Sequence, residues 1–177
     1  MNGEEHKIIQ EILKEVFANV NNWLTHAETK NAALIAFNVA CLSFLWDINS
    51  TNKNITLFYI VCIGMVLSTV MSLISFIPQM GKKVNSKGKH SAYDNLIFYV
   101  DISKYNKGEY IKAVYKQYAK MDISDSDVLK IEDDLSAEIT YNSTVVIRKY
   151  KWFNYAIKSE LICLILLVIA MICNIIN

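Results

Sequence analysis

The stretch ITLFYIVCIGMVLSTVMSLISFIPQMG, residues 55–81, decides the fold class. It carries no charged side chain between Lys53 and Lys82. A helix needs about 20 mainly apolar residues to cross the hydrocarbon core of a bilayer, which is roughly 30 Å thick. The stretch therefore predicts a membrane-spanning helix over residues 55–80. Pro78 lies near its end, where regular helix is expected to stop.

Two further apolar runs indicate two more spans. LICLILLVIAMICNII, residues 161–176, is uncharged, and aromatic residues precede it at 152–155 as in an interfacial belt, so we predict a span over 153–176. NAALIAFNVACLSFLW, residues 31–46, is short and contains Asn38. We predict a span over about 29–47, which requires flanking side chains to snorkel. A buried amphipathic helix is the alternative for this run.

The polar parts of the chain also have helical periodicity. No Gly or Pro interrupts residues 4–46, which predicts one long helix over 4–47, about 65 Å in length. Apolar positions recur along it at three- and four-residue steps: Ile9, Ile12, Val16, Val20, Trp23, Ala27 and Leu34, followed by Asn38.

A second long helix is predicted to lead into the last span. The Ser124–Asp127 cluster is typical of a helix N-terminus, and a stripe follows it: Val128, Ile131, Leu135, Ile139, Asn142, Val146, Lys149 and Phe153. Ile111, Val114, Tyr115 and Tyr118 indicate a short amphipathic helix opened by Gly108. Residues 93–102 fit either helix or strand. The sequence thus predicts an all-α protein, a single domain over 1–177, with a three-helix membrane bundle and a helical extension over 81–152.

The distribution of positive charge predicts the orientation of the spans. The link between the first two spans has one basic residue, whereas residues 81–151 have thirteen, including a basic linker at Lys82–Lys89. Basic residues near membrane spans favour the cytoplasmic side. We therefore expect the N-terminal helix and residues 81–152 to be cytoplasmic and the C-terminus to lie outside.

Composition and motifs argue against several function classes. The net charge is +1, which does not favour binding of a nucleic-acid polymer. All four cysteines lie in hydrophobic runs, as small apolar residues do, and no motif for phosphate binding, zinc or a nucleophilic serine occurs. The histidines His6, His26 and His90 are isolated, and Glu132, Asp133 and Asp134 are expected on a solvated face. The sequence predicts neither an enzyme nor a bound cofactor.

Polar residues that interrupt apolar stripes are the candidates for ligand binding. Lys149 and Asn142 lie on the inward stripe of the last helix, where an unpaired cation is costly. Lys149 either snorkels to lipid headgroups or meets an anionic ligand. Lys30 lies at the predicted membrane boundary, and its side chain is also a candidate for snorkelling to lipid headgroups. Asn38 is expected within the membrane bundle, bonded to another helix.

Three segments resemble a known family. They are HAETKNAALIAFN at 26–38, NLIFYVDISKYNKGEYI at 95–111 and DLSAEITYNSTVVIRKYKWFNYA at 134–156. Their order, and their position before and between apolar spans, resemble the Pycsar transmembrane effectors. The resemblance extends from about residue 22 to the C-terminus.

The resemblance implies an antiphage effector of the inner membrane. In such a system a partner cyclase makes a cyclic pyrimidine mononucleotide, cUMP or cCMP, which the effector senses before it impairs the membrane and causes abortive infection. Related effectors respond to other cyclic nucleotides. We expect a homo-oligomer in the lipid bilayer, with the nucleotide as activating ligand rather than cofactor. The candidate contacts are Lys30, Asp101, Tyr110, Asn142 and Lys149: the lysines would hold the phosphate, and Asp101 or Asn142 would read the base or ribose. The alternative is a ligand-independent membrane scaffold or a toxin-like pore.

The predicted orientation is testable by cysteine accessibility. A membrane-impermeant thiol reagent applied to intact cells should label a cysteine introduced at Asn52 or after Asn177, and should not label one introduced at Ser86. The reason is that the thirteen basic residues of segment 81–151 favour the cytoplasmic side of the membrane. Labelling at Ser86 would overturn the orientation.

Overall fold

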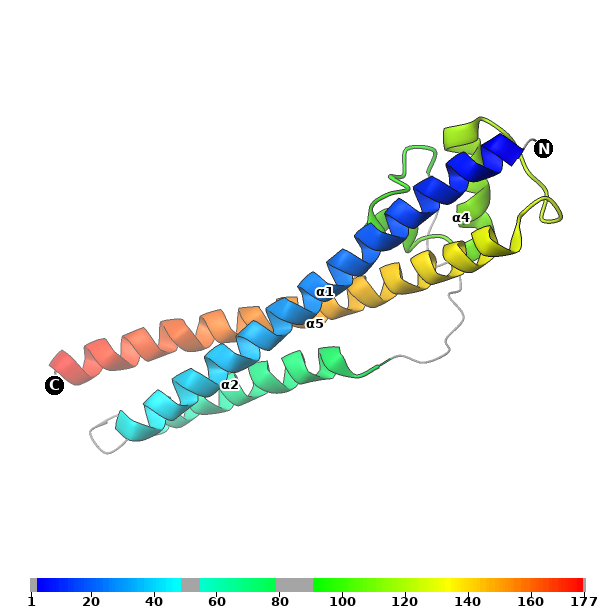
Figure 1. Ribbon diagram of the computed structural model, residues 1–177. Coiled ribbons are helices and arrows are strands. Elements are labelled where there is room, and N and C mark those ends of the chain that lie inside the picture. Colours follow the sequence, from blue (N-terminus) through cyan, green and yellow to red (C-terminus); the bar gives the residue numbers. More distant parts are fainter. Residues whose placement is uncertain (1–2, 49–54, 79–90, 177) are drawn as a thin grey trace. The chain divides into compact units, whose positions relative to one another are not determined.

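The computed structural model describes residues 3–48, 55–78 and 91–176, and all regular structure in these ranges is helical (Figure 1). The all-α prediction is therefore confirmed. The helices are α1 (Gly3–Ile48), α2 (Ile55–Phe76), α3 (Tyr99–Ile102), α4 (Lys107–Val114), the π-helix η2 (Tyr115–Ala119) and α5 (Lys130–Ile176). The predicted linker Lys82–Lys89, the last two residues of the predicted second span, and Asn52, Ser86 and Asn177 lie outside the described residues.

The chain forms two compact units. The polar unit comprises Met1–Thr25 and Gln79–Arg148, and the membrane unit comprises His26–Pro78 and Lys149–Asn177. Helices α1 and α5 each contribute residues to both units. Three helices are long and apolar enough to cross a membrane, namely α1, α2 and α5, which confirms the three predicted spans at the level of length and composition.

Helix α2 shows how the membrane unit is built. Its buried positions recur at three- and four-residue steps, and the three nearer its C-terminal end are serines: Phe58, Val61, Met65, Ser68, Ser72 and Ser75. Large apolar side chains cover its exposed faces, among them Ile60, Ile63, Val66, Leu67, Val70 and Leu73. A soluble helix would bury its apolar stripe and expose its polar residues. In the C-terminal half of α2 this pattern is reversed, with serines buried and large apolar residues exposed, as expected when lipid surrounds the helix.

The parts of α1 and α5 in the membrane unit follow the same rule. Their buried positions again combine apolar and polar residues at helical spacing: Ala27, Asn31, Leu34, Asn38 and Leu45 on α1, and Lys149, Ala156, Glu160, Cys163 and Ala170 on α5. Their exposed faces carry large apolar residues such as Phe37 and Phe44 on α1 and Ile162, Ile165 and Val168 on α5. All three helices therefore expose large apolar side chains and bury a mixture of polar and apolar ones.

The membrane unit also has a purely apolar zone. Leu45 of α1, Phe58, Val61 and Met65 of α2 and Cys163 of α5 form one buried cluster. Gly64 allows α2 and α5 to approach closely there, because a Cβ added at this position would lie 2.2 Å from Cys163 Sγ. Small residues at helix contacts are the usual means of close packing in membranes.

The core of the polar unit is made of side chains from α1, α4, η2 and α5. Its buried apolar residues include Ile9, Leu13, Val16 and Val20 of α1, Tyr110, Ile111 and Val114 of α4, Tyr115 of η2, and Ile139 and Val146 of α5. Leu13 is fully buried whereas Ile12 is only half-buried, so the predicted α1 stripe was wrong by one residue at this turn. Edge-on packing of aromatic rings contributes, as between Tyr105 and Tyr110.

Capping interactions set the helix boundaries in the polar unit. Asn106 accepts a hydrogen bond from the Glu109 backbone N–H, and Glu109 accepts one from the Asn106 backbone N–H, a capping box that opens α4. The predicted start of the last helix at Ser124–Asp127 was wrong. Those residues form a turn in which Asp127 accepts a hydrogen bond from the Ser124 hydroxyl, and α5 begins at Lys130. The 93–102 segment consists of turns followed by α3.

The contact between Gly64 and Cys163 predicts a specific defect and its rescue. Gly64→Ala should destabilise the membrane unit by about 1–3 kcal/mol, because overpacking a close contact forces its neighbours apart. Cys163→Ala should relieve the defect by removing Sγ. Unfolding of purified protein in mixed micelles, measured for both single variants and the double variant, gives the coupling free energy. Additive effects of the two substitutions would contradict the predicted contact.

Candidate functional site

A row of buried polar side chains lies inside the membrane unit. It comprises Asn31 and Asn38 of α1, Ser68, Ser72 and Ser75 of α2, and Lys149 and Glu160 of α5, all at most 6% exposed. Polar and ionisable groups at membrane depth are costly and tend to mark functional pathways. The row is therefore the first candidate for a functional site.

Lys149 occupies one part of this row. Its Nζ donates a hydrogen bond to the Ser75 carbonyl oxygen at 3.1 Å and lies 3.1 Å from Glu28 Oε1. It also lies 5.4 Å from the centre of the Phe76 ring. A buried ammonium group needs such partners, because transfer from water without them costs several kcal/mol. Glu28 is about half exposed, so the pair has one buried and one accessible member.

Another part of the row consists of Glu160, Asn38 and Ser68, with the half-buried Thr69 beside them. One terminal amide atom of Asn38 lies 2.7 Å from Glu160 Oε2 and 3.3 Å from Oε1. The other lies 3.0 Å from Ser68 Oγ and 3.1 Å from Thr69 Oγ1. Ser68 Oγ is also 3.0 Å from the Ala156 carbonyl oxygen. The prediction that Asn38 bonds across helices within the bundle agrees with these contacts.

The candidate contacts for a ligand divide between the two units. Lys30 and Lys149 belong to the membrane unit, and Asp101, Tyr110 and Asn142 belong to the polar unit. Lys30 is exposed and its Nζ lies 5.2 Å from the centre of the Tyr150 ring, an arrangement typical of a cation–π contact.

Asp101 belongs to a charged network that folds the segment before α4. Lys104 Nζ lies 2.6 Å from Asp101 Oδ1 and 2.8 Å from Asp94 Oδ1. Asp101 also accepts a hydrogen bond from the Asn95 backbone N–H. The hydrogen bond from Lys104 lowers the pKa of Asp94 to about 2 and also lowers the pKa of Asp101, so both are carboxylates at neutral pH.

Tyr110 and Asn142 are already engaged in the polar unit. Tyr110 is fully buried, its hydroxyl donates to the Leu96 carbonyl oxygen at 2.8 Å, and its burial raises its pKa. Asn142 donates from its amide to Asn21 Oδ1 at 2.9 Å, which joins α5 to α1. In this conformation both side chains hold the unit together.

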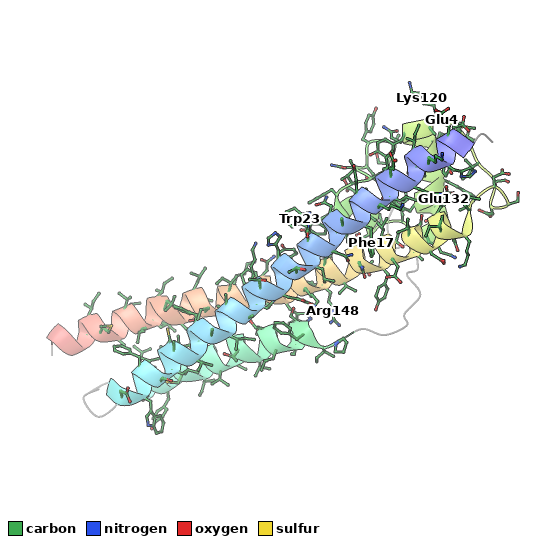
Figure 2. All side chains as sticks on the ribbon, viewed as in Figure 1. Glu4, Phe17, Trp23, Lys120, Glu132 and Arg148 are labelled. Atoms are coloured by element: carbon green, nitrogen blue, oxygen red, sulfur yellow. The ribbon has the colours of Figure 1, made fainter. Side chains whose placement is uncertain are left out.

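A second polar cluster was missed in the sequence. His6 Nδ1 lies 2.8 Å from Glu132 Oε1 and 2.7 Å from the Tyr115 hydroxyl, and the Leu129 backbone N–H donates to Glu132 Oε2 (Figure 2 labels Glu132). Two predictions were therefore wrong: Glu132 is fully buried rather than solvated, and His6 is not isolated. Burial and the charge of Glu132 raise the pKa of Tyr115. The cluster ties the start of α1 to η2 and α5.

The polar row itself was only partly foreseen. The sequence alone assigned no function to Glu160 or to the serines of α2, because a single serine or glutamate in or beside an apolar run does not indicate a site. The available signal was periodicity: Ser68, Ser72 and Ser75 share one helical face, and Glu160 falls eleven residues after Lys149, close to three turns. Among the described residues, no group of His, Cys, Asp and Glu is arranged to hold a metal ion.

A comparison with models of known protein families gives a match over most of the chain. The family model described as the Pycsar effector protein domain matches residues 12–175, nearly the whole chain. The chain belongs to this family. No curated protein and no solved structure matches it.

Membership in the Pycsar effector family, together with three membrane-capable helices, identifies a multi-pass membrane protein and supports a role in antiphage defence. The family is not a known enzyme family. The inside-out arrangement of the membrane unit agrees with that placement, because apolar side chains cover its outer faces.

Proposed function

We propose that this protein is a Pycsar effector that binds a cyclic nucleotide, with cUMP or cCMP as the favoured ligands, and then impairs the inner membrane to cause abortive infection. The match over residues 12–175 carries the proposal, because it covers polar and membrane segments together. The nucleotide comes from a partner cyclase. The N-terminal helix and residues 81–152 face the cytoplasm, and the C-terminus lies outside.

The phosphate of the ligand is proposed to compete with Glu28 for Lys149. The ammonium group of Lys149 is largely buried and 3.1 Å from the Glu28 carboxylate, which is accessible enough to be displaced. A phosphate oxygen is a strong acceptor for such a group. Lys30 of α1, whose ammonium group lies over the Tyr150 ring, supplies the second cation for the phosphate. Ligand binding would thus break the resting ion pair between Lys149 and Glu28.

Reading of the base or ribose is assigned to the polar unit. Asp101 and Asn142 have the acceptors and donors that this requires, although Lys104 and Asn21 occupy them at present. Tyr110 would support the site from the core, since its hydroxyl already binds Leu96. Exchange of these internal partners for ligand atoms would couple binding to rearrangement.

Membrane impairment is proposed to require association of several chains. The three spans of one chain share an apolar cluster, Leu45, Phe58, Val61, Met65 and Cys163, which is proposed to keep the resting bundle closed. A ligand shifts such a state only through its different affinities for the closed and open forms. We propose a symmetric homo-oligomer whose subunits rotate or associate on ligand binding. The polar residues of several bundles would then line one common path through the membrane.

The ligand assignment predicts the effect of removing either lysine. Lys149→Ala and Lys30→Ala should each weaken cyclic nucleotide binding about ten- to a hundredfold, since a lost charged hydrogen bond costs roughly 1.5–3 kcal/mol. Titration calorimetry with purified protein against a panel of cyclic mono- and oligonucleotides measures this. Lys151→Ala, an exposed neighbour, is the matched control. Native affinity in both variants would refute the assignment.

The membrane function predicts ligand-dependent leakage. Nucleotide should release dye and ions from liposomes that contain the protein. Asn38→Leu should weaken the leak more than it weakens binding, because interhelical amide bonds are worth on the order of 0.6–2 kcal/mol in membranes. Val39→Leu, on the exposed face of α1, is the control. Leakage without ligand would favour the toxin-like pore, and no leak from nucleotide-bound protein would favour recruitment of another component.

A further inference from the structure

We propose that Glu160 is a proton-binding site within the membrane unit, and that its proton sets the orientation of the Asn38 amide. The inference does not depend on which nucleotide activates the protein. It rests on the heavy-atom geometry around Glu160, where two hydrogen-bond networks are possible and the protonation state of the carboxyl group selects between them.

The surroundings of Glu160 favour a neutral carboxyl group. Glu160 is 1% exposed in a span, and no cationic side chain pairs with it among the residues that the structure describes. The titratable groups that face it are the thiols of Cys41 on α1 and Cys163 on α5, and α2 presents the Ser68 hydroxyl. Thiols are mostly neutral at pH 7 and do not compensate a carboxylate. An unpaired charge at membrane depth is costly, so binding of a proton removes the cost.

With Glu160 protonated, the network is complete. The carboxyl O–H donates to Asn38 Oδ1, and the separation of 2.7 Å is typical of an O–H···O bond. The two N–H groups of Asn38 then donate to Ser68 Oγ and Thr69 Oγ1. Those hydroxyls keep their single protons for carbonyl oxygens, Ser68 for Ala156 at 3.0 Å and Thr69 for Met65 at 2.9 Å. Every donor has one acceptor.

With Glu160 ionised, the same atoms form a poorer network. Two acceptors cannot face each other, so the Asn38 amide must turn and donate from Nδ2 to the carboxylate. The Ser68 and Thr69 hydroxyls, which have one proton each, then donate to the Asn38 oxygen or, in the case of Ser68, to the carboxylate itself. The Ala156 carbonyl loses its bond from Ser68, which is a direct link between α2 and α5. Release of the proton thus loosens the contact between these helices.

Unpartnered oxygens supply a route for the proton. Ser72 Oγ and Ser75 Oγ on α2, and Asn31 Oδ1 on α1, are buried without a hydrogen-bond partner. Ser72 and Ser75 continue the buried face of Ser68 toward the end of α2 where Lys149 binds the Ser75 carbonyl. Buried polar oxygens of this kind are satisfied by water, and water molecules along them would relay a proton. Next to Glu160, Cys163 of α5 belongs to the apolar cluster that includes Met65.

The proposal is tested by infrared spectroscopy and by pH titration of the full chain in liposomes. The native protein should show a carboxylic acid C=O band at neutral pH that is absent in Glu160→Gln and retained in Glu138→Gln, an exposed control on α5. Glutamine can donate to Asn38 Oδ1 as the protonated acid does, so the fold is retained. Asn38→Leu should shift the band without removing it, which gives a second readout should the first variant not fold.

Stability provides the independent arm of the test. The native state holds a proton that the unfolded state has released, so stability should fall as pH rises. The slope should be smaller in Glu160→Gln than in Glu138→Gln by up to one proton per chain. A band that persists in Glu160→Gln, or equal slopes, would overturn the proposal. A change in stability when sodium replaces choline at constant pH would overturn it in favour of a cation site.

Discussion

Within a bilayer, polar groups have no water to bind, so each must find a partner inside the protein or be neutralised. The contact between Glu160 and Asn38 shows this constraint at two fully buried side chains. It joins a carboxyl group on α5 to an amide on α1, and through Ser68 to α2. Lys149 meets the same requirement by donating to the Ser75 carbonyl oxygen and pairing with the Glu28 carboxylate.

The two units differ in the kinds of side chain that they bury and expose. The polar unit buries apolar residues such as Ile9 and Ile139 and uses Lys104 to organise carboxylates near its surface. The membrane unit buries serines, asparagines and a glutamate and leaves residues such as Ile63 and Ile165 exposed. An antiphage effector must be harmless at rest and damaging when activated. Under the proposed function, the buried polar side chains of the membrane unit would line the permeation path, and the apolar cluster would close it at rest.

The sequence predicted the helices well and their partners poorly. Uncharged runs and helical steps identified the three spans and the stripe of α1, because length and periodicity are properties of single segments. The start of α5 was misplaced because Ser124 and Asp127 bond to each other in a turn, whereas Glu132 caps the helix at Leu129. Glu132 and His6 meet across 126 positions of sequence, which no local pattern reveals. The same holds for Asn38 and Glu160: Asn38 was predicted to bond to another helix, but its partner Glu160 was not predicted, because the pairing depends on how two helices pack.

Helix α2 turns its serines inward and leaves its large apolar residues exposed, as a helix that faces lipid does. Site-directed spin labelling along residues 60–75 in liposomes tests it most directly, with collision rates measured for oxygen, which is concentrated in lipid, and for a polar nickel reagent. Labels at Ile63, Val66, Leu67 and Val70 should collide freely with oxygen, whereas labels at Ser68, Ser72 and Ser75 should be protected, with a period close to 3.6 residues. High oxygen accessibility at the serines, or the same accessibility at all positions, would contradict the burial of the α2 serines and the exposure of its apolar residues.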